Sequence, residues 1–301
     1  MLAIEEVSST FSSLFKGNLN KEDCCNSGCN PCIYDVYEKQ LKLYDKYKNS
    51  HNVPTDLKPN GILQGEYTSF VATNVLILCK SHKLIKFKKK DSGHRVFWKV
   101  GEHFYILFKK DSQKCSRAYT PIKPNEDDCD FEIIVKVYEN GLVSNHLYNL
   151  VKGDTTLWRG PYGGYEVTPN KFNNIVLFAQ GTGIIPLISI TQEILNNEDD
   201  MTKIFLYYCT HSIETILYRE ELYSKKSFWN FSYKVYLSSS SNCALKYEEP
   251  ILDRKLDVRD IELLKPADVN QYVICGSNEF MSFYKKFLVT NEISLQNIIL
   301  L

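Results

Sequence analysis

The stretch at 115–121 reads Cys-Ser-Arg-Ala-Tyr-Thr-Pro and stands at the end of a strand-like segment. Alternation along an extended strand places Arg117 and Tyr119 on the same face. A guanidinium can bind a pyrophosphate through two parallel hydrogen bonds, and a phenol ring can lie flat against a planar ring system. Thr120 adds a hydroxyl at the edge of that ring. The pattern predicts a cradle for a flavin nucleotide; the alternative is an ordinary strand with Arg117 as a solvated charge.

The region around this stretch, from residue 61 to about 167, consists of short segments rich in Val, Ile, Tyr and Phe, separated by turns. Many short strands at this spacing are typical of an antiparallel barrel or sandwich of roughly 100 residues. The expected strands cover 67–79, 96–100, 104–108, 131–138 and 155–158.

A basic run lies inside this region and consists of Lys80, Lys83, Lys86, Lys88, Lys89 and Lys90. Such a run is usually a solvated loop, and the alternative is a surface for an acidic protein partner.

The pattern changes after the turn Gly-Pro-Tyr-Gly-Gly at 160–164. Strands that alternate with helices predict a parallel sheet with right-handed crossovers, and ligands bind at the carboxyl ends of its strands. The expected strands cover 175–179, 204–209, 233–237 and 272–275, and the expected helices cover 186–195, 214–223 and 279–289. The fold class is therefore two-domain α+β: an antiparallel β-barrel, then an α/β domain with a parallel sheet.

Two tight turns fall at the carboxyl edge of this predicted sheet. Residues 180–186 read Gln-Gly-Thr-Gly-Ile-Ile-Pro directly after the first strand, and 275–278 read Cys-Gly-Ser-Asn directly before a helix. Glycines allow a close approach of the backbone, and the helix that begins near Pro186 directs its first amides at an anion such as a dinucleotide pyrophosphate. The two turns predict a nucleotide-binding cleft.

Four cysteines lie close together near the N-terminus, at Cys24, Cys25, Cys29 and Cys32. Cys29 and Cys32 have the spacing that lets two thiolates reach one zinc ion or iron-sulfur cluster. Two adjacent cysteines rarely bind the same ion, and the two-residue spacing is not repeated, so a structural or redox-sensitive knot without metal stays open as the alternative. A helix should follow, because apolar side chains recur at helical spacing at Tyr34, Tyr37, Leu41 and Tyr44.

Composition limits the class of protein. The 301 residues are 44% hydrophobic, which is enough for two cores, and 36 basic residues balance 36 acidic ones. A chain without net charge lacks the field of a dedicated nucleic-acid binder, so small-molecule or protein partners are expected. The division that follows is a polar tail at 1–22, a Cys-rich segment at 23–48, a linker at 49–60, the barrel at 61–168 and the α/β domain at 169–301.

The sequence also carries signals about location. Glu5 and Glu6 stand where a secretory signal would be basic, and the most apolar region, 175–190, is interrupted by glycines and Pro186. We therefore expect no transmembrane segment and an intracellular, reducing compartment, either cytoplasmic or peripheral to an organelle membrane. The scattered cysteines fit such a compartment: they are Cys79, Cys115, Cys129, Cys209, Cys243 and Cys275.

The order of these motifs resembles the ferredoxin-NADP reductase superfamily. Arg-x-Tyr-Thr is followed by Gly-Pro-x-Gly, by Gly-Thr-Gly-Ile-x-Pro and by Cys-Gly. The chain is similar in particular to NADH-cytochrome b5 reductases of the branch that carries an N-terminal Cys-rich, oxidoreductase-like segment. The resemblance covers 23–46 and about 61–301, which makes the barrel an FAD-binding domain and the α/β domain an NAD-binding domain.

The resemblance implies a role for each matched residue. Arg117 would hold the FAD pyrophosphate, Tyr119 would pack against the flavin ring, and Thr120 would form a hydrogen bond near its N5 atom. Cys275 would set the nicotinamide over the ring, so the catalytic positions are Thr120 and Cys275. The implied cofactor-binding set is Arg117, Ala118, Tyr119, Thr120, Val135, Lys136, Tyr138, Gly141, Val143, Ser144, Gly181, Thr182, Gly183, Cys275 and Gly276.

Some positions depart from the family pattern. Prolines usually follow the Cys-Gly of the family, whereas this chain has Ser277 and Asn278, and Ile185 replaces a frequent threonine. The acidic residue that often favours NADH aligns with Thr215, although Glu214 is adjacent. Because no arginine cluster is present there to hold a 2′-phosphate, we expect NADH rather than NADPH.

The implied activity is hydride transfer from NADH to FAD, followed by release of single electrons to a one-electron acceptor, with cytochrome b5 or a similar haem protein as partner. Geometry and electrostatics, rather than an acid or base, would carry this chemistry. The alternatives are a flavin reductase for an iron-sulfur or flavoprotein partner, and a redox or assembly protein in which the reductase body has lost turnover through Ser277 and Asn278.

Overall fold

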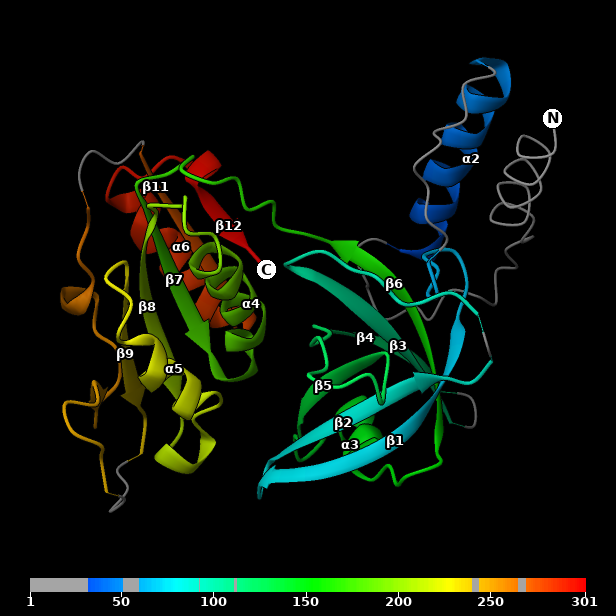
Figure 1. The fold of residues 1–301 in the computed structure, drawn as a ribbon, viewed down its shortest axis with the longest axis horizontal. Helices are drawn as coiled ribbons and strands as arrows, with labels where there is room; N and C mark the ends of the chain where they lie inside the picture. The colour runs from blue at the N-terminus through cyan, green and yellow to red at the C-terminus, as the bar shows by residue number, and fades with distance from the viewer. Residues whose placement is uncertain (1–31, 51–59, 92, 111–112, 240–243, 265–268) are drawn as a thin grey trace. The chain divides into compact units, whose positions relative to one another are not determined.

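The computed structural model describes residues 32–50, 60–91, 93–110, 113–239, 244–264 and 269–301. They form two compact units (Figure 1). Unit 1 holds most of the chain up to Gly163, and unit 2 holds Gly164–Leu301 together with Leu78–His82 and Lys99–Gly101.

Unit 1 contains a six-stranded antiparallel sheet in the order β4, β3, β6, β1, β2, β5. Its core is aromatic: Phe87, Phe131 and Trp158 are fully buried, and the ring centroids of Phe87 and Phe131 lie 5.3 Å apart. The predicted barrel is confirmed. Its elements are β1 (Thr68–Cys79), β2 (His82–Lys89), β3 (Glu102–Lys110), β4 (Gln113–Tyr119), β5 (Phe131–Lys136), α3 (Leu142–Tyr148) and β6 (Thr155–Gly163).

The basic run is not a loop, because most of it forms strand β2. Ile85 and Phe87 are fully buried and alternate with Lys86 and Lys88. The Nζ of Lys86 lies 2.9 Å from an oxygen of the Asp128 carboxylate on the other face. Lys86 and Lys88 therefore lie on the face of the strand opposite to Ile85 and Phe87, which fill the core.

Two further strand predictions need correction. Residues 96–100 do not form a strand, because the Asn60 side chain takes both backbone groups of Phe97: its Oδ1 accepts the N–H at 2.9 Å, and its Nδ2 donates to the carbonyl at 2.7 Å. Strand β6 is longer than predicted and runs through the Gly-Pro-Tyr-Gly sequence to Gly163.

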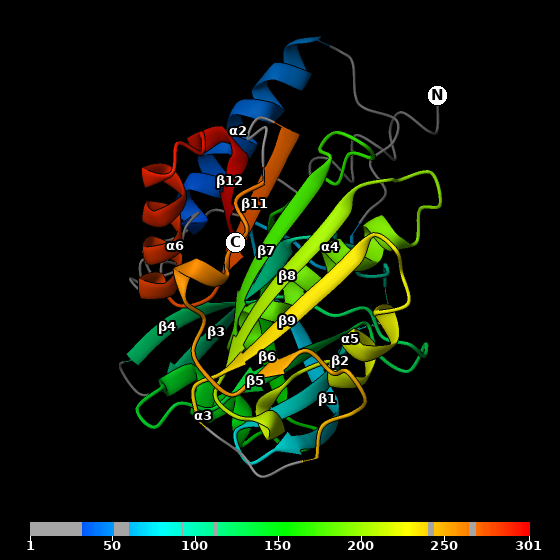
Figure 2. The same cartoon turned by 90° about the vertical axis from the view of Figure 1, so that its left-hand side faces the viewer.

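Unit 2 contains a six-stranded parallel sheet in the order β10, β9, β8, β7, β11, β12. Val176 and Phe178 of β7 belong to the core cluster that contains Tyr284 of α6, and alternation turns the neighbouring β7 residues toward α4 on the opposite face (Figure 2). The elements are β7 (Asn174–Gln180), α4 (Ile184–Leu195), β8 (Lys203–Thr210), α5 (Arg219–Lys225), β9 (Phe231–Leu237), β10 (Ile251–Leu252), β11 (Asn270–Cys275), α6 (Asn278–Thr290) and β12 (Ile298–Leu300).

The helix predicted at 214–223 is only partly correct. A short 3-10 turn covers Ile213–Thr215, and α5 begins at Arg219, directly after Tyr218, whose φ of 57° is left-handed. A tyrosine with this backbone conformation cannot continue a right-handed helix. The helices predicted at 186–195 and 279–289 are confirmed as α4 and α6.

Helix α2 (Ile33–Ser50) belongs to unit 1 and confirms the helix predicted after the Cys-rich segment. Its start is capped by Asp35, which accepts a hydrogen bond from the Cys32 amide at 3.0 Å. Val36 is buried in a cluster with Tyr105 of β3 and Tyr162 of β6, so the helix packs on the outer face of the barrel. Among the described residues, no helix combines the length and hydropathy needed to cross a membrane.

Candidate cofactor site

Strand β4 carries the central residues of the predicted cradle. Arg117 pairs with Ile106 and Tyr119 pairs with Phe104, so both side chains lie on the face of the sheet that covers the barrel core. The Tyr119 ring contacts Trp158 edge to face, with 6.0 Å between ring centroids. Arg117 is exposed, and its Nη1 donates to the Ser116 carbonyl at 2.7 Å. Thr120 follows the strand directly and is half-buried.

The other wall of the cradle comes from β5 and the turn after it. Val135 is buried, while the Nζ of Lys136 lies 5.4 Å from the ring centroid of Tyr138. Burial first, and then the nearby Tyr138 phenol, raises the pKa of Tyr119, whereas Arg117 lowers it. These effects require Arg117, Tyr119 and Tyr138 to lie close together. A cation near two aromatic residues fits the phosphates and the ring of a flavin nucleotide.

The turn before α3 is the predicted phosphate segment. A Cβ atom on Gly141 would lie 2.2 Å from Ser144 Oγ, so only glycine fits. The Ser144 hydroxyl donates to the Gly141 carbonyl at 3.2 Å and accepts from the Tyr138 amide at 3.3 Å. The hydroxyl therefore stabilises the turn, and Gly141, which lines a cavity and has no side chain, allows a close approach of its backbone by a phosphate.

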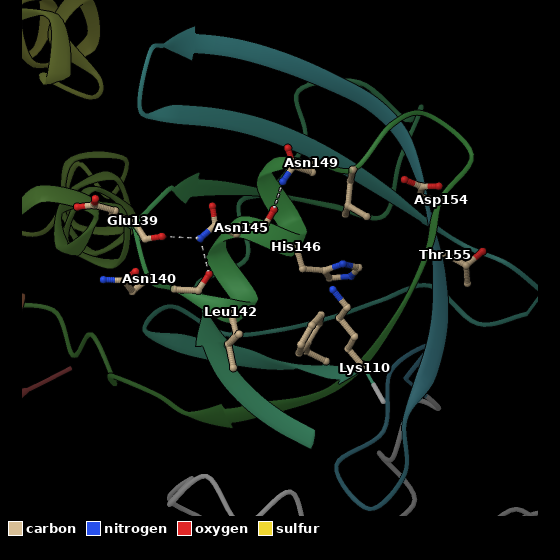
Figure 3. Close-up of a pocket in the computed structure, with 12 residues that line it drawn as sticks. Lys110, Glu139, Asn140, Leu142, Asn145, His146, Asn149, Asp154 and Thr155 are labelled. Carbon is tan, nitrogen blue, oxygen red and sulfur yellow. Dashed lines mark hydrogen bonds between the residues drawn. The ribbon is translucent and has the colours of Figure 1, made fainter. Parts of the chain in front are cut away.

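A cavity of about 710 Å³ lies beside this turn in unit 1 (Figure 3). Sequence reasoning missed Asn145, whose side chain donates to the carbonyls of Tyr138 and Gly141, at 2.8 Å in each case, and so fixes the turn. Burial lowers the pKa of His146, and the Asp154 carboxylate opposes this shift. The lining residues are Phe108, Lys110, Glu139, Asn140, Gly141, Leu142, Asn145, His146, Asn149, Leu150, Asp154 and Thr155.

Both predicted glycine turns lie at the carboxyl edge of the sheet in unit 2. Gly181 has a left-handed φ of 55° and no atom within 4 Å of a built Cβ, so its surface is open. Gly183 is tightly packed, because a Cβ there would lie 2.3 Å from the Cys275 carbonyl oxygen. Thr182 stands between them and is half-buried. The glycines therefore bring the ends of β7 and β11 together and leave room for a pyrophosphate.

Cys275 ends β11 beside this turn. Burial raises the pKa of its thiol to about 12, so the thiol stays protonated at neutral pH. A protonated thiol is a poor nucleophile but can pack against a ring. Next to it, a Cβ on Gly276 would lie 2.7 Å from the Gln180 Cβ. Ser277 caps α6, with its Oγ accepting from the Phe280 amide at 3.3 Å, which gives the first departure from the family pattern a structural reason.

Thr215, which aligns with the family's acidic residue, forms hydrogen bonds within its own turn. The Thr215 hydroxyl accepts from the Ser212 amide at 3.0 Å and lies 2.9 Å from the Thr210 hydroxyl. Glu214 is exposed, and a hydrogen bond from Ser212 holds the pKa of its carboxyl below the usual range. Glu214 is thus the ionised group available at the end of β8.

The predicted thiol cluster falls mainly outside the described residues. This applies to Cys24, Cys25 and Cys29, whereas Cys32 immediately precedes α2 and its amide donates to Asp35. Within the ranges that the structure describes, no group of three or more His, Cys, Asp or Glu side chains is placed to hold a metal ion. A metal on the N-terminal cysteines stays a prediction.

Comparison with known protein families gives three matches along the chain. Residues 70–167 match an oxidoreductase FAD-binding domain, and residues 177–286 match an oxidoreductase NAD-binding domain. Residues 20–52 match the N-terminal segment of an oxidoreductase-like protein.

Similar proteins are known from several organisms. An "NADH-cytochrome b5 reductase-like" protein of Homo sapiens is 30% identical over 273 residues, which cover 85% of each chain. A protein of the same name from Mus musculus is 30% identical and covers 69% of this chain and 68% of its own. The cytochrome b5 reductase domain of Ulva prolifera nitrate reductase has a similar fold, with a TM-score of 0.68 at 22% identity, over 81% of this chain and 100% of that domain.

Proposed function

The chain belongs to the NADH-cytochrome b5 reductase-like family of FAD- and NAD-binding oxidoreductases, and we propose that it takes hydride from NADH and passes electrons singly to a haem protein of the cytochrome b5 type. The observation that carries the proposal is the placement of Arg117 and Tyr119 on one face of β4, over the aromatic core of unit 1. Bound FAD would supply the step from a two-electron donor to a one-electron acceptor.

The protein's own residues would bind FAD and NADH and orient them toward each other. Arg117 and the backbone at Gly141 would hold the phosphates of FAD, and Tyr119 would support its ring. The turn at Gly181–Gly183 would receive the pyrophosphate of NADH, and Cys275 would contact its nicotinamide through a neutral thiol. Because Tyr119 and Cys275 both stay protonated at neutral pH, neither residue would act as a base.

NADH is the proposed donor because Glu214 is the ionised group at the end of β8 and would accept hydrogen bonds from a ribose diol. A 2′-phosphate at that place would meet a like charge. Cys79, Cys129, Cys209 and Cys275 are free thiols, which supports a reducing compartment as the proposed location.

The test is anaerobic reduction of the purified yellow protein by NADH and by NADPH, followed by mixing with cytochrome b5. We expect NADH to bleach the flavin faster than NADPH and the haem then to be reduced. A protein that is bleached by NADH but does not reduce cytochrome b5 has a different acceptor. A protein that holds no flavin, or whose flavin NADH does not bleach, contradicts the proposed reductase activity.

A further inference from the structure

A side-chain hydrogen bond joins the two turns at the carboxyl edge of the parallel sheet. The Ser277 amide, just after β11, donates to Oε1 of Gln180, the last residue of β7, at 3.0 Å. The two residues are 97 positions apart in the chain, and β7 pairs directly with β11 in the sheet. Gln180 also packs on Gly276, which lies between Cys275 and Ser277.

Ser277 takes part in this contact through its backbone, while its side chain has a separate role. Its Oγ caps α6, and its N–H is the group that Gln180 binds. The φ of Ser277 is −66°, which a proline also adopts, but a proline has no N–H to donate. The hydrogen bond to Gln180 therefore depends on a non-proline residue at position 277, and it fixes a turn that a proline ring would stiffen by itself.

We propose that Gln180 is a positioning residue for hydride transfer: by binding the Ser277 amide it sets the turn Cys275–Ser277 against the turn Gly181–Gly183. This inference rests on the proposed function, because the positioned group is the nicotinamide of NADH. Gln180 acts through the turn and takes no part in bond making. Hydride transfer is sensitive to such placement, since a shift of about 1 Å can cost on the order of a hundredfold in rate.

The test uses Gln180→Met, which keeps the length of the side chain and removes the acceptor. We expect flavin reduction at saturating NADH to slow by about tenfold, because the nicotinamide would be partly misplaced. FAD content and reoxidation by ferricyanide should stay unchanged. Amide exchange at Ser277 should become faster in this variant. Faster exchange with an unchanged reduction rate would overturn the positioning role, and unchanged exchange would overturn the hydrogen bond itself.

A double-mutant comparison separates the loss of this hydrogen bond from other structural effects of the substitution. In a Ser277→Pro background there is no N–H to bind, so adding Gln180→Met should cost less than twofold in rate and in NAD⁺ affinity. In a Ser277→Ala background, which keeps the N–H and loses only the cap, the same change should again cost about tenfold in rate. Equal losses in both backgrounds refute the proposal. If NADH does not bleach the flavin of the unaltered protein, the proposed function fails instead. Amide exchange at Ser277, compared between the unaltered protein and Gln180→Met, still tests the hydrogen bond to Gln180.

Discussion

Arg117 combines an exposed position with a firm anchor. One of its N–H groups donates to the Ser116 carbonyl, and its cross-strand partner Ile106 is buried in the aromatic core. A guanidinium fixed at one corner loses little freedom when it binds a phosphate. In the proposed function, the geometry of Arg117 would therefore be largely set before FAD binds.

The variant Arg117→Ala should lose FAD. Removal of a charged hydrogen bond to phosphate weakens binding by about 2 kcal/mol, or roughly thirtyfold in Kd. Flavin content after purification and titration of the apoprotein with FAD measure this effect. Lys123→Ala, an exposed basic residue after the same strand, is the matched control and should keep a full complement of flavin. Full flavin content in Arg117→Ala would show that the phosphates bind elsewhere.

The variant Cys275→Ala should keep FAD and slow its reduction by NADH, because in the proposed function the thiol would pack against the nicotinamide without reacting. Loss of alignment should lower the rate by about tenfold, with reoxidation unaffected. Cys209 lies near the end of β8, which β7 separates from β11, and burial likewise raises the pKa of its thiol to about 12. Cys209→Ala is therefore the control, and its flavin should be reduced at the normal rate. Covalent trapping of Cys275 by thiol reagents during turnover would instead indicate a nucleophile.

At the level of secondary-structure elements, helix α2 packs against the barrel. Val36 lies against Tyr105 and Tyr162, and beneath these rings the Arg159 guanidinium is buried, with its carbon 5.2 Å from the Tyr105 ring centroid and 5.0 Å from that of Tyr162. Tyr105 pairs with Ala118 of β4, which follows Arg117. The helix thus covers the outer face of the strands whose inner face forms the cradle.

The variant Val36→Asp should weaken this contact, because the carboxylate would be buried against two rings. We expect a loss of about 2 kcal/mol in the stability of unit 1, with greater accessibility of Tyr105 and Tyr162 to acetylation. Urea unfolding and mass spectrometry of the modified tyrosines measure the two effects. Glu38→Ala, on the exposed side of the same helix, should change neither. Unaltered stability in Val36→Asp would mean that α2 contributes nothing to the unit.

The sequence predicted the elements whose signal is local. The parallel strands and helices α4 and α6 follow from continuous apolar runs and glycine turns, and the Arg-x-Tyr-Thr stretch does form a strand with both side chains on one face. Strand β2 was not predicted, because a segment so rich in lysine is typical of a solvated loop. The strand signal in it is the alternation of Ile85 and Phe87 with lysines. The contacts of Asn60 with Phe97 and of Gln180 with Ser277 join distant positions, and no local pattern reveals them.

At the scale of the whole molecule, the two units have different kinds of core. Unit 1 closes around stacked aromatic rings, and it also buries polar groups between β3 and β6. His103 of β3 is half-buried as a residue, but its Nε2 atom is buried and has no hydrogen-bond partner within the described part of the chain. Such an imidazole beside a guanidinium makes the stability of this unit depend on pH.

Burial, followed by the charge of Arg159, lowers the pKa of His103 to about 4. The unfolded chain binds a proton near pH 6.5 and the folded protein does not, so this contribution to stability is complete above pH 6.5 and is lost as the pH falls toward 4. We expect a loss of at most about 2 kcal/mol between pH 7 and pH 5. Urea unfolding at both pH values should show a smaller loss in His103→Gln. The exposed His94→Gln is the control, and an identical pH dependence in His103→Gln would refute the assignment.

The contact of Trp158 with Tyr119 also gives the barrel an optical signal. Trp158 is fully buried and should emit at short wavelength, whereas Trp229 in the other unit is 64% exposed and should emit at longer wavelength. Flavins absorb in the range where indoles emit, so a flavin ring on Tyr119 would quench the short-wavelength band by energy transfer. Loss of flavin would restore that band, and the fluorescence spectrum of the intact protein would then report occupancy of the cradle without any label.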